Sequence, residues 1–182
     1  MDKTLISRRF AKAVGTYLDK ADVQRYVASR MAELTGRYIP ADVQERVLEI
    51  GCGTGMFTRM YLKQAAPEEM WLNDLCPEVK PYLADVLGEK VHFVAKDAET
   101  LAFPGGQDLI VSCSAVQWFD DLPRFFSGCR RLLHEGGYLA FSTFGPHNTE
   151  EVATLASAGL SYPSLEALRE MLAARYEVVY AC

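Results

Sequence analysis

The sequence has 182 residues, which is enough for one domain with a sizeable hydrophobic core. Its composition, 49% hydrophobic and 24% charged, is that of an ordinary globular protein, and the formal charge of −5 argues against nucleic acid as the main partner. No stretch is long and apolar enough to span a bilayer, and the five cysteines form no C-x-x-C pair, so we expect no membrane attachment, no metal site and a cytoplasmic location.

The chain begins with a helical region and continues with alternating strands and helices. Apolar residues at helical spacing predict one or two amphipathic helices from about Ile6 to Arg37, ended by Pro40. Short apolar runs then predict five strands, at Arg46–Ile50, Met70–Asn73, Val91–Ala95, Asp108–Ser112 and, after a stop at Gly136–Gly137, Tyr138–Thr143. The intervening helices are expected from Met56 to about Lys63, from Pro77 onward, and over Asp121–Leu133.

Helices near Thr149–Ala158 and Ser164–Ala174 and a sixth strand at Tyr176–Ala181 are expected to complete the chain. This alternation predicts an α/β fold, in which a parallel sheet carries helices on both faces and binds its ligand at the carboxyl ends of the strands. We expect a single domain with an N-terminal helical cap (1–39), a cofactor-binding core (40–144), and lid helices with the final strand (145–182).

The most informative motif joins the first strand to the next helix, with an acid at Glu49 and glycines at Gly51, Gly53 and Gly55. Glycines allow the backbone to approach a ligand closely. A dinucleotide site, G-x-G-x-x-G, would need its third glycine at position 56, which is Met56. The pattern E-x-G-x-G-x-G instead resembles motif I of the class I S-adenosylmethionine-dependent methyltransferases; the alternative is an ordinary glycine-rich turn. The resemblance implies a Rossmann-like sheet and S-adenosylmethionine as the cofactor.

If the glycine loop holds S-adenosylmethionine, its ribose hydroxyls need an acceptor after the second strand. Asp74, followed by Leu75, meets this need, although a helix-capping or turn aspartate is the alternative. Adenine needs an acceptor for its amine after the third strand, where Asp97 is followed by the Ala98 amide; a surface turn is the alternative there. The acids near the cationic sulfonium, beginning with Glu49, would supply a matching field.

Further segments resemble one branch of these enzymes, the malonyl-[acyl-carrier-protein] O-methyltransferases that begin pimelate synthesis for biotin. The matching segments are Tyr17 to Arg25, Asp97 to Pro104 with the strand after it, Ala115 to Trp118, and Ser142 to Pro146. The resemblance extends from about Phe10 to Leu172 and implies methyl transfer to the free carboxylate of a malonyl thioester on acyl carrier protein. It leaves open a related methyltransferase acting on another small molecule, such as a quinone precursor, or a non-catalytic module that binds S-adenosylmethionine.

The same resemblance implies an acceptor pocket shaped by Tyr17 and Gln117 as catalytic residues, with Trp118 packed beneath them. Core packing is an equal alternative for Tyr17 and Trp118. A carboxylate acceptor is ionised at neutral pH and needs no general base, and only His147 among the three histidines is placed to reach the cleft. We further expect Tyr17 and the segment 145–148 to meet above the sulfonium methyl group.

The chain also departs from the family pattern. A class I sheet has seven strands, whereas six are predicted here. Relatives often have asparagine and an aliphatic residue where this chain has Cys113 and Ser114; we still place Cys113 among the cofactor contacts. An acyl carrier protein is acidic, so a basic face is expected on the enzyme. Two clusters could supply it unless both are ordinary solvated faces: Arg8, Arg9 and Lys12, and Arg124, Arg130 and Arg131.

Overall fold

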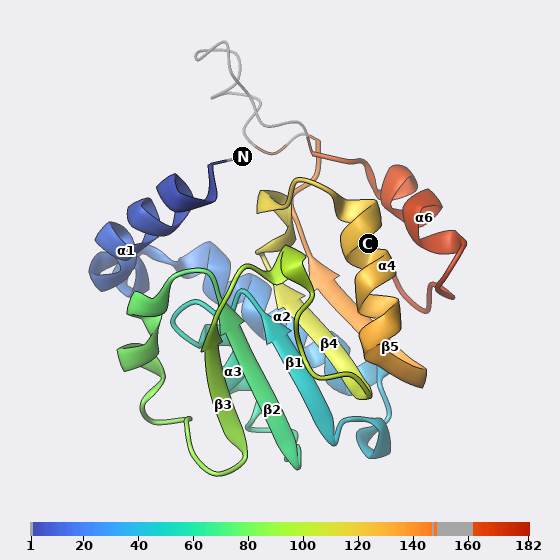
Figure 1. Cartoon of the computed structure of the whole chain (residues 1–182), viewed down its shortest axis with the longest axis horizontal. Helices are drawn as coiled ribbons and strands as arrows, with labels where there is room; N and C mark the ends of the chain where they lie inside the picture. The colour runs from blue at the N-terminus through green and yellow to red at the C-terminus, as the bar shows by residue number, and fades with distance from the viewer. Residues whose placement is uncertain (1, 147, 149–161) are drawn as a thin grey trace.

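A five-stranded parallel sheet forms the centre of the molecule (Figure 1). This computed structural model describes residues 2–146, 148 and 162–182, and of residues 13, 14 and 16–20 only the backbone. The strands are β1 (Arg46–Ile50), β2 (Glu69–Asp74), β3 (Val91–Ala95), β4 (Gln107–Cys113) and β5 (Leu133–Ser142). They lie in the order β3-β2-β1-β4-β5 with every neighbouring pair parallel, so their carboxyl ends meet at one edge. The predicted α/β fold is confirmed.

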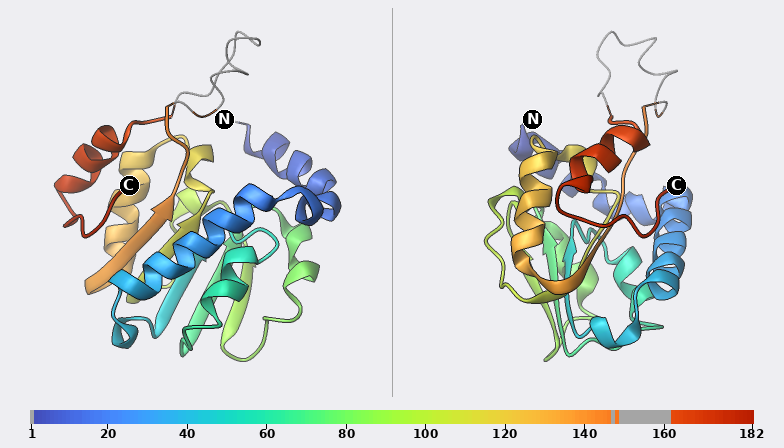
Figure 2. Two further views of the ribbon diagram at one scale, coloured as in Figure 1. Left: turned by 180° about the vertical axis from the view of Figure 1, so that it is seen from behind. Right: turned by 90° about the vertical axis from the view of Figure 1, so that its right-hand side faces the viewer.

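Helices cover both faces of the sheet, as the continuous burial of β1 from Val47 to Ile50 requires. Val47 faces α2 (Asp22–Tyr38) and α3 (Met56–Tyr61), whereas Leu48 and Ile50 face α4 (Leu122–Leu132) and α6 (Leu165–Ala173). Figure 2 shows α2 crossing the back of the sheet, with α1 (Lys3–Lys20) continuing from it beyond the carboxyl edge of the strands. The N-terminal region is therefore two helices, separated at the buried residue Ala21.

Two elements differ from their predictions. Strand β5 begins at Leu133 and passes through both glycines that were expected to end the preceding helix. The pairing with β4 shifts register there, Gly136 has a φ of +84°, and a Cβ on Gly137 would lie 2.9 Å from the Gln107 carbonyl oxygen. The glycines therefore permit a strand irregularity and a close backbone approach. The segment beginning at Pro77 is a 3-10 helix, η2 (Pro77–Leu83).

The predicted sixth strand is wrong: residues 176–181 have no strand pairing to any part of the chain that the structure describes. Side chains hold this segment instead. The Tyr176 hydroxyl donates to the Phe126 carbonyl oxygen at 2.7 Å, and the Tyr180 ring stacks on Tyr38 of α2 with centroids 4.7 Å apart. An alternating pattern of apolar residues favours an extended segment, but a β-strand also needs a neighbouring strand with which it can form hydrogen bonds.

The helix predicted near Ser164–Ala174 is confirmed as α6, which Ser164 caps by accepting the Ala167 N–H. The helix expected at Thr149–Ala158 lies outside the described residues. Among the helices that the structure describes, none combines the length and apolar character needed to cross a membrane.

Candidate functional site

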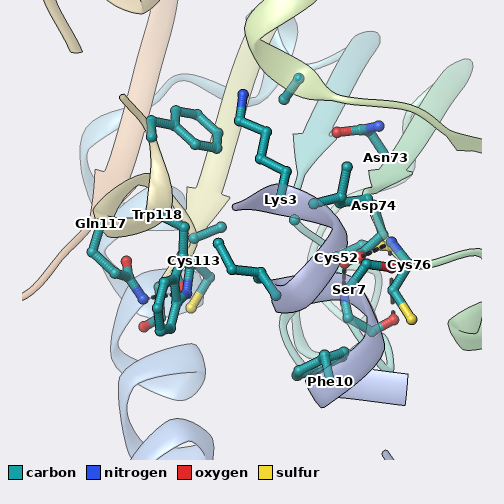
Figure 3. A pocket seen from close by; sticks show the side chains of 18 of the residues that line it. Lys3, Ser7, Phe10, Cys52, Asn73, Asp74, Cys76, Cys113, Gln117 and Trp118 are labelled. Carbon is teal, nitrogen blue, oxygen red and sulfur yellow. Dashed lines mark hydrogen bonds between the residues drawn. The ribbon is translucent and has the colours of Figure 1, made fainter. Parts of the chain in front are cut away.

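A cavity of about 680 Å³ lies at the carboxyl edge of the sheet, covered by α1. Its size is within the range of ordinary ligand pockets, roughly 300–1,000 Å³. The close view in Figure 3 shows α1 passing between two groups of side chains, with Asn73, Asp74 and Cys76 on one side and Cys113, Gln117 and Trp118 on the other. Phe119 and Phe144 also line the cavity.

The three motif glycines have different roles in this structure. All have positive φ, of +71°, +52° and +78° for Gly51, Gly53 and Gly55. A Cβ on Gly51 would lie 2.3 Å from the Ala115 Cβ, whereas a Cβ on Gly53 would meet only the Phe10 ring, at 3.7 Å. Gly51 and Gly53 line the cavity, as predicted. Gly55 is not among the lining residues; its left-handed backbone begins α3.

Asp74 connects the glycine loop to the end of β2. Its carboxylate accepts the N–H of Gly53 at 2.8 Å and the N–H of Cys76 at 2.8 Å, and the residue is 8% exposed at the cavity wall. Burial raises the pKa of this carboxyl, and the backbone hydrogen bonds partly offset the effect. Leu75 lines the cavity beside it. The turn role weighed from the sequence is therefore present, and the carboxylate also lines the cavity.

Asn73 is a site residue that the sequence did not indicate. Its amide donates to the carbonyl oxygens of Val94, at 3.2 Å, and Lys96, at 2.8 Å, which joins the ends of β2 and β3. It is 1% exposed and lines the cavity. One feature of the sequence could have indicated Asn73 as a site residue. It is a polar residue at the end of an apolar strand, and it directly precedes Asp74, the predicted ribose-binding acid.

Glu49 lies at the base of the cavity and is 1% exposed. Burial raises its pKa to about 8; a hydrogen bond from the Thr58 hydroxyl, at 2.7 Å, lowers it, and the negative charge of Asp74 raises it further. A cation in the cavity would favour the ionised form of this carboxyl. Nearby, the Thr54 hydroxyl is buried with no hydrogen-bond partner among the described residues. Both groups are suited to a polar, positively charged ligand.

Asp97 lines the cavity after β3, but its carboxylate is already engaged. The Lys3 ammonium donates to both of its oxygens, at 3.0 and 2.8 Å, and also to the Glu99 carboxylate. Burial lowers the pKa of Lys3, but these acceptors outweigh it and leave the pKa raised. Asp97 also accepts the Glu99 N–H at 3.0 Å, which places buried Ala98 against the cavity. No local pattern indicated a role for Lys3, because its partners are 94 and 96 residues away in the chain.

The opposite wall carries the predicted acceptor residue. The Gln117 amide donates to the Ser114 carbonyl oxygen at 2.7 Å, and its own oxygen is buried without a partner among the described residues. Cys113 also lines this wall; it accepts from the Ser142 hydroxyl at 3.8 Å, and burial raises its pKa to about 11. Trp118 was expected to pack beneath Gln117, but it is 39% exposed at the rim, because the short helix η4 (Val116–Trp118) lies at the surface.

Three thiols line the cavity, since Cys52 and Cys76 join Cys113. Burial is the main cause that raises the pKa of each, to about 11 for Cys76 and well above its usual value for Cys52. In the described part of the chain, no group of three or more histidine, cysteine, aspartate or glutamate side chains could hold a metal ion.

Two predicted positions stay untested. Tyr17 lies in α1, but its side chain is outside the described residues, as is His147. Gly145, Pro146 and Asn148 are exposed after β5. The predicted meeting of Tyr17 with this segment remains a prediction.

Comparison with known proteins agrees with this geometry. Residues 48–141 match a family model described as a methyltransferase domain. A malonyl-[acyl-carrier protein] O-methyltransferase of Bacteroides thetaiotaomicron is 47% identical over 182 residues, which are 100% of this chain and 69% of the relative. The chain belongs to this methyltransferase family. A malonyl-[acyl-carrier protein] O-methyltransferase of Porphyromonas gingivalis is 38% identical over 99% of this chain and 69% of the relative. Another, from Bacteroides fragilis, is 46% identical, and the chain spans only 36% of its length.

Solved methyltransferase structures share the fold at low sequence identity. A methyltransferase in complex with the Haloferax volcanii Trm112 activator superimposes with a TM-score of 0.75 at 19% identity, covering 91% of this chain and 75% of that one. A structure described as a DhpI-SAM-HEP complex gives 0.72 at 17% identity, covering 96% and 89%. The family resemblance noted in the sequence is therefore confirmed, together with the methyltransferase fold.

Proposed function

We propose that this chain transfers a methyl group from S-adenosylmethionine to the free carboxylate of a malonyl thioester carried by acyl carrier protein. One observation carries the proposal: the acids and glycines after β1, β2 and β3 line one cavity, in a chain 47% identical to a malonyl-[acyl-carrier protein] O-methyltransferase. This function places the chain at the start of biotin synthesis, and we keep the prediction of a cytoplasmic location.

The residues present fit S-adenosylmethionine. Gly53 lines the cavity, where a Cβ would come into van der Waals contact with the Phe10 ring at 3.7 Å, and the Thr54 hydroxyl is buried without a partner among the described residues. Asp74 would hold the ribose hydroxyls, and Asp97 with the Ala98 N–H would hold adenine. When bound, the cofactor supplies an activated methyl group on a positively charged sulfur.

The side chains then have three tasks: to bind, to orient and to exclude water. The negative field of Asp74 and of ionised Glu49 would stabilise the positive charge in the buried site. No general base is required, since a carboxylate acceptor is already ionised. Gln117 would hold the acceptor carboxylate in line by donating from its amide NH2 group, since the amide oxygen can only accept. The cover formed by α1 would keep water from the reacting carboxylate.

The test is turnover with isotopically labelled S-adenosylmethionine, using malonyl-acyl carrier protein and a small malonyl thioester as acceptors. We expect a labelled malonyl methyl ester. Tyr17→Phe and Gln117→Ala should reduce turnover while leaving S-adenosylmethionine affinity nearly unchanged, because both are predicted to orient the acceptor. If product formed only on a quinone precursor, that compound would replace the malonyl thioester as the proposed substrate. Binding of S-adenosylmethionine with no product on any acceptor would instead indicate a non-catalytic binding module.

A further inference from the structure

Helix α1 has two faces with different chemistry. The inner face lines the cavity through Lys3, Ile6, Ser7 and Phe10. The outer face carries Leu5, Arg8, Arg9 and Lys12, which share one side because residues three and four apart are neighbours on a helix. All four outer residues are exposed, and Leu5 is exposed by 44%. We refer to these four residues as the α1 outer face.

The cations of the α1 outer face form no ion pair with any side chain that the structure describes. Lys3 on the inner face differs, since it is paired with Asp97 and Glu99. The acid that precedes these cations in the chain, Asp2, accepts the Leu5 N–H at 3.0 Å as the cap of α1. In a chain with a formal charge of −5, three neighbouring cations are a local departure from the overall charge.

This positive surface adjoins the opening of the cavity. Leu5 and Arg9 belong both to the α1 outer face and to the cavity lining, and the exposed indole of Trp118 lines the cavity as well. Exposed apolar side chains beside cations are typical of a protein interface, where an apolar centre is surrounded by polar groups. A nucleic acid would need a broader basic surface.

The second basic cluster is divided along α4, because Arg124 lies in the first turn of this helix and Arg130 and Arg131 lie in the last turn. The last turn leads directly into the start of β5. That end of α4 is at the amino edge of the parallel strands, opposite the edge that carries the cavity (Figure 1). A substrate carrier held there could not deliver its acyl group to the cavity. The pair Arg130 and Arg131 therefore provides a matched control on the same molecule.

We propose that the α1 outer face is the docking surface for the acidic acyl carrier protein, with the tethered malonyl group entering beside Leu5 and Trp118. This inference rests on the proposed function and adds the surface that selects a carrier-bound thioester over a free one. Complementary charge of this kind mainly raises the association rate and the selectivity for the partner. The dependence on carrier protein should therefore weaken as the salt concentration increases.

The test compares Arg8→Glu/Lys12→Glu with Arg130→Glu/Arg131→Glu. Neither pair lines the cavity, so S-adenosylmethionine affinity and kcat/KM for a small malonyl thioester should stay near the parent values in both. We expect Arg8→Glu/Lys12→Glu to raise the Kd for fluorescent holo-acyl carrier protein, and to lower kcat/KM for its malonyl form, by about tenfold or more at low salt. The α4 pair should change neither.

Equal carrier binding by the parent and by Arg8→Glu/Lys12→Glu would overturn the docking surface, as would an equal effect of both double variants. If Arg8→Glu/Lys12→Glu lowered kcat/KM equally for the small thioester and for the carrier-bound one, the two residues would be needed for the structure of α1, and the docking surface would be rejected. If the parent protein methylates neither thioester, the proposed function fails, and the carrier-binding measurement still decides the docking surface on its own.

Discussion

The floor and the cover of the cavity are built in different ways. The floor, formed by the loop after β1 and the end of β2, is fixed by backbone hydrogen bonds, positive-φ glycines and a buried core. The cover, α1, begins at Lys3, whose ion pairs with Asp97 and Glu99 are partly exposed, with side-chain exposures of 25% for Lys3, 34% for Asp97 and 13% for Glu99. Such pairs contribute little stability, because water can replace them. Changes in the floor should therefore alter affinity and folding, whereas changes in the cover should alter rates.

The largest effect is expected from Gly53→Val. Its side chain would occupy the space between the loop and Phe10, so S-adenosylmethionine affinity in calorimetry should fall by about 100-fold or more, equal to roughly 2.8 kcal/mol. The positive φ adds a stability cost of roughly 1–2 kcal/mol, which leaves the domain folded.

Gly55→Ala is the matched control for that variant. The added Cβ would lie 2.6 Å from Leu83 Cδ2, outside the cavity lining, so it should lower the unfolding free energy and spare the affinity. Unchanged affinity in Gly53→Val would remove the glycine loop from the binding site.

Asp74→Ala should reduce both affinity and stability. It leaves the N–H groups of Gly53 and Cys76 without their acceptor and removes the predicted ribose contact. Hydrogen bonds to a charged group contribute about 1.5–3 kcal/mol each. Calorimetry and urea unfolding measure the two losses separately, and Asp74→Asn, which keeps one oxygen, should recover part of each. Lower stability with normal affinity would make Asp74 a structural turn residue alone.

A smaller effect, which depends on pH, is expected for the contribution of Glu49 to the unfolding free energy. Its pKa rises from 4.5 in the unfolded chain to about 8 when it is buried, so between these values the folded protein binds more protons than the unfolded one. The contribution of Glu49 to the unfolding free energy should therefore fall as pH rises from about 4.5 to 8, and Glu49→Gln should remove this dependence. A cationic ligand should also release a proton, measurable by calorimetry in two buffers. Identical pH profiles for parent and variant would contradict the burial of a titrating carboxyl.

The smallest effect is expected in the cover. Lys3→Met removes two partly exposed ion pairs that together contribute about 1 kcal/mol, so S-adenosylmethionine should dissociate only a few-fold faster in stopped-flow measurements. Lys12→Met, on the outer face of α1, is the control and should leave the dissociation rate unchanged. A large loss of folding stability in Lys3→Met would show that the cover is part of the core.

The sequence predicted the floor well and the cover poorly. Glu49, Gly51, Gly53 and Asp74 lie in short motifs at strand ends, where neighbours in the chain set the geometry. The contact of Lys3 with Asp97 joins residues 94 apart, and no local pattern records such a pair. The two errors in the predicted strands also arose because strand pairing depends on residues that are distant in the chain. The glycines before Tyr138 fit within β5 because of the irregular register with β4, and residues 176–181 have no neighbouring strand among the described residues.

The environment of the cysteines has a practical consequence for labelling the protein. Alkylating reagents attack the thiolate, and burial keeps Cys52, Cys76, Cys113 and Cys129 in the thiol form at neutral pH. Cys182 is a free cysteine and exposed. A maleimide dye added briefly at pH 7 should therefore attach at Cys182, far along the chain from α1 and away from the residues that line the cavity. A dye at this position would leave the cavity free, with no cysteine replaced.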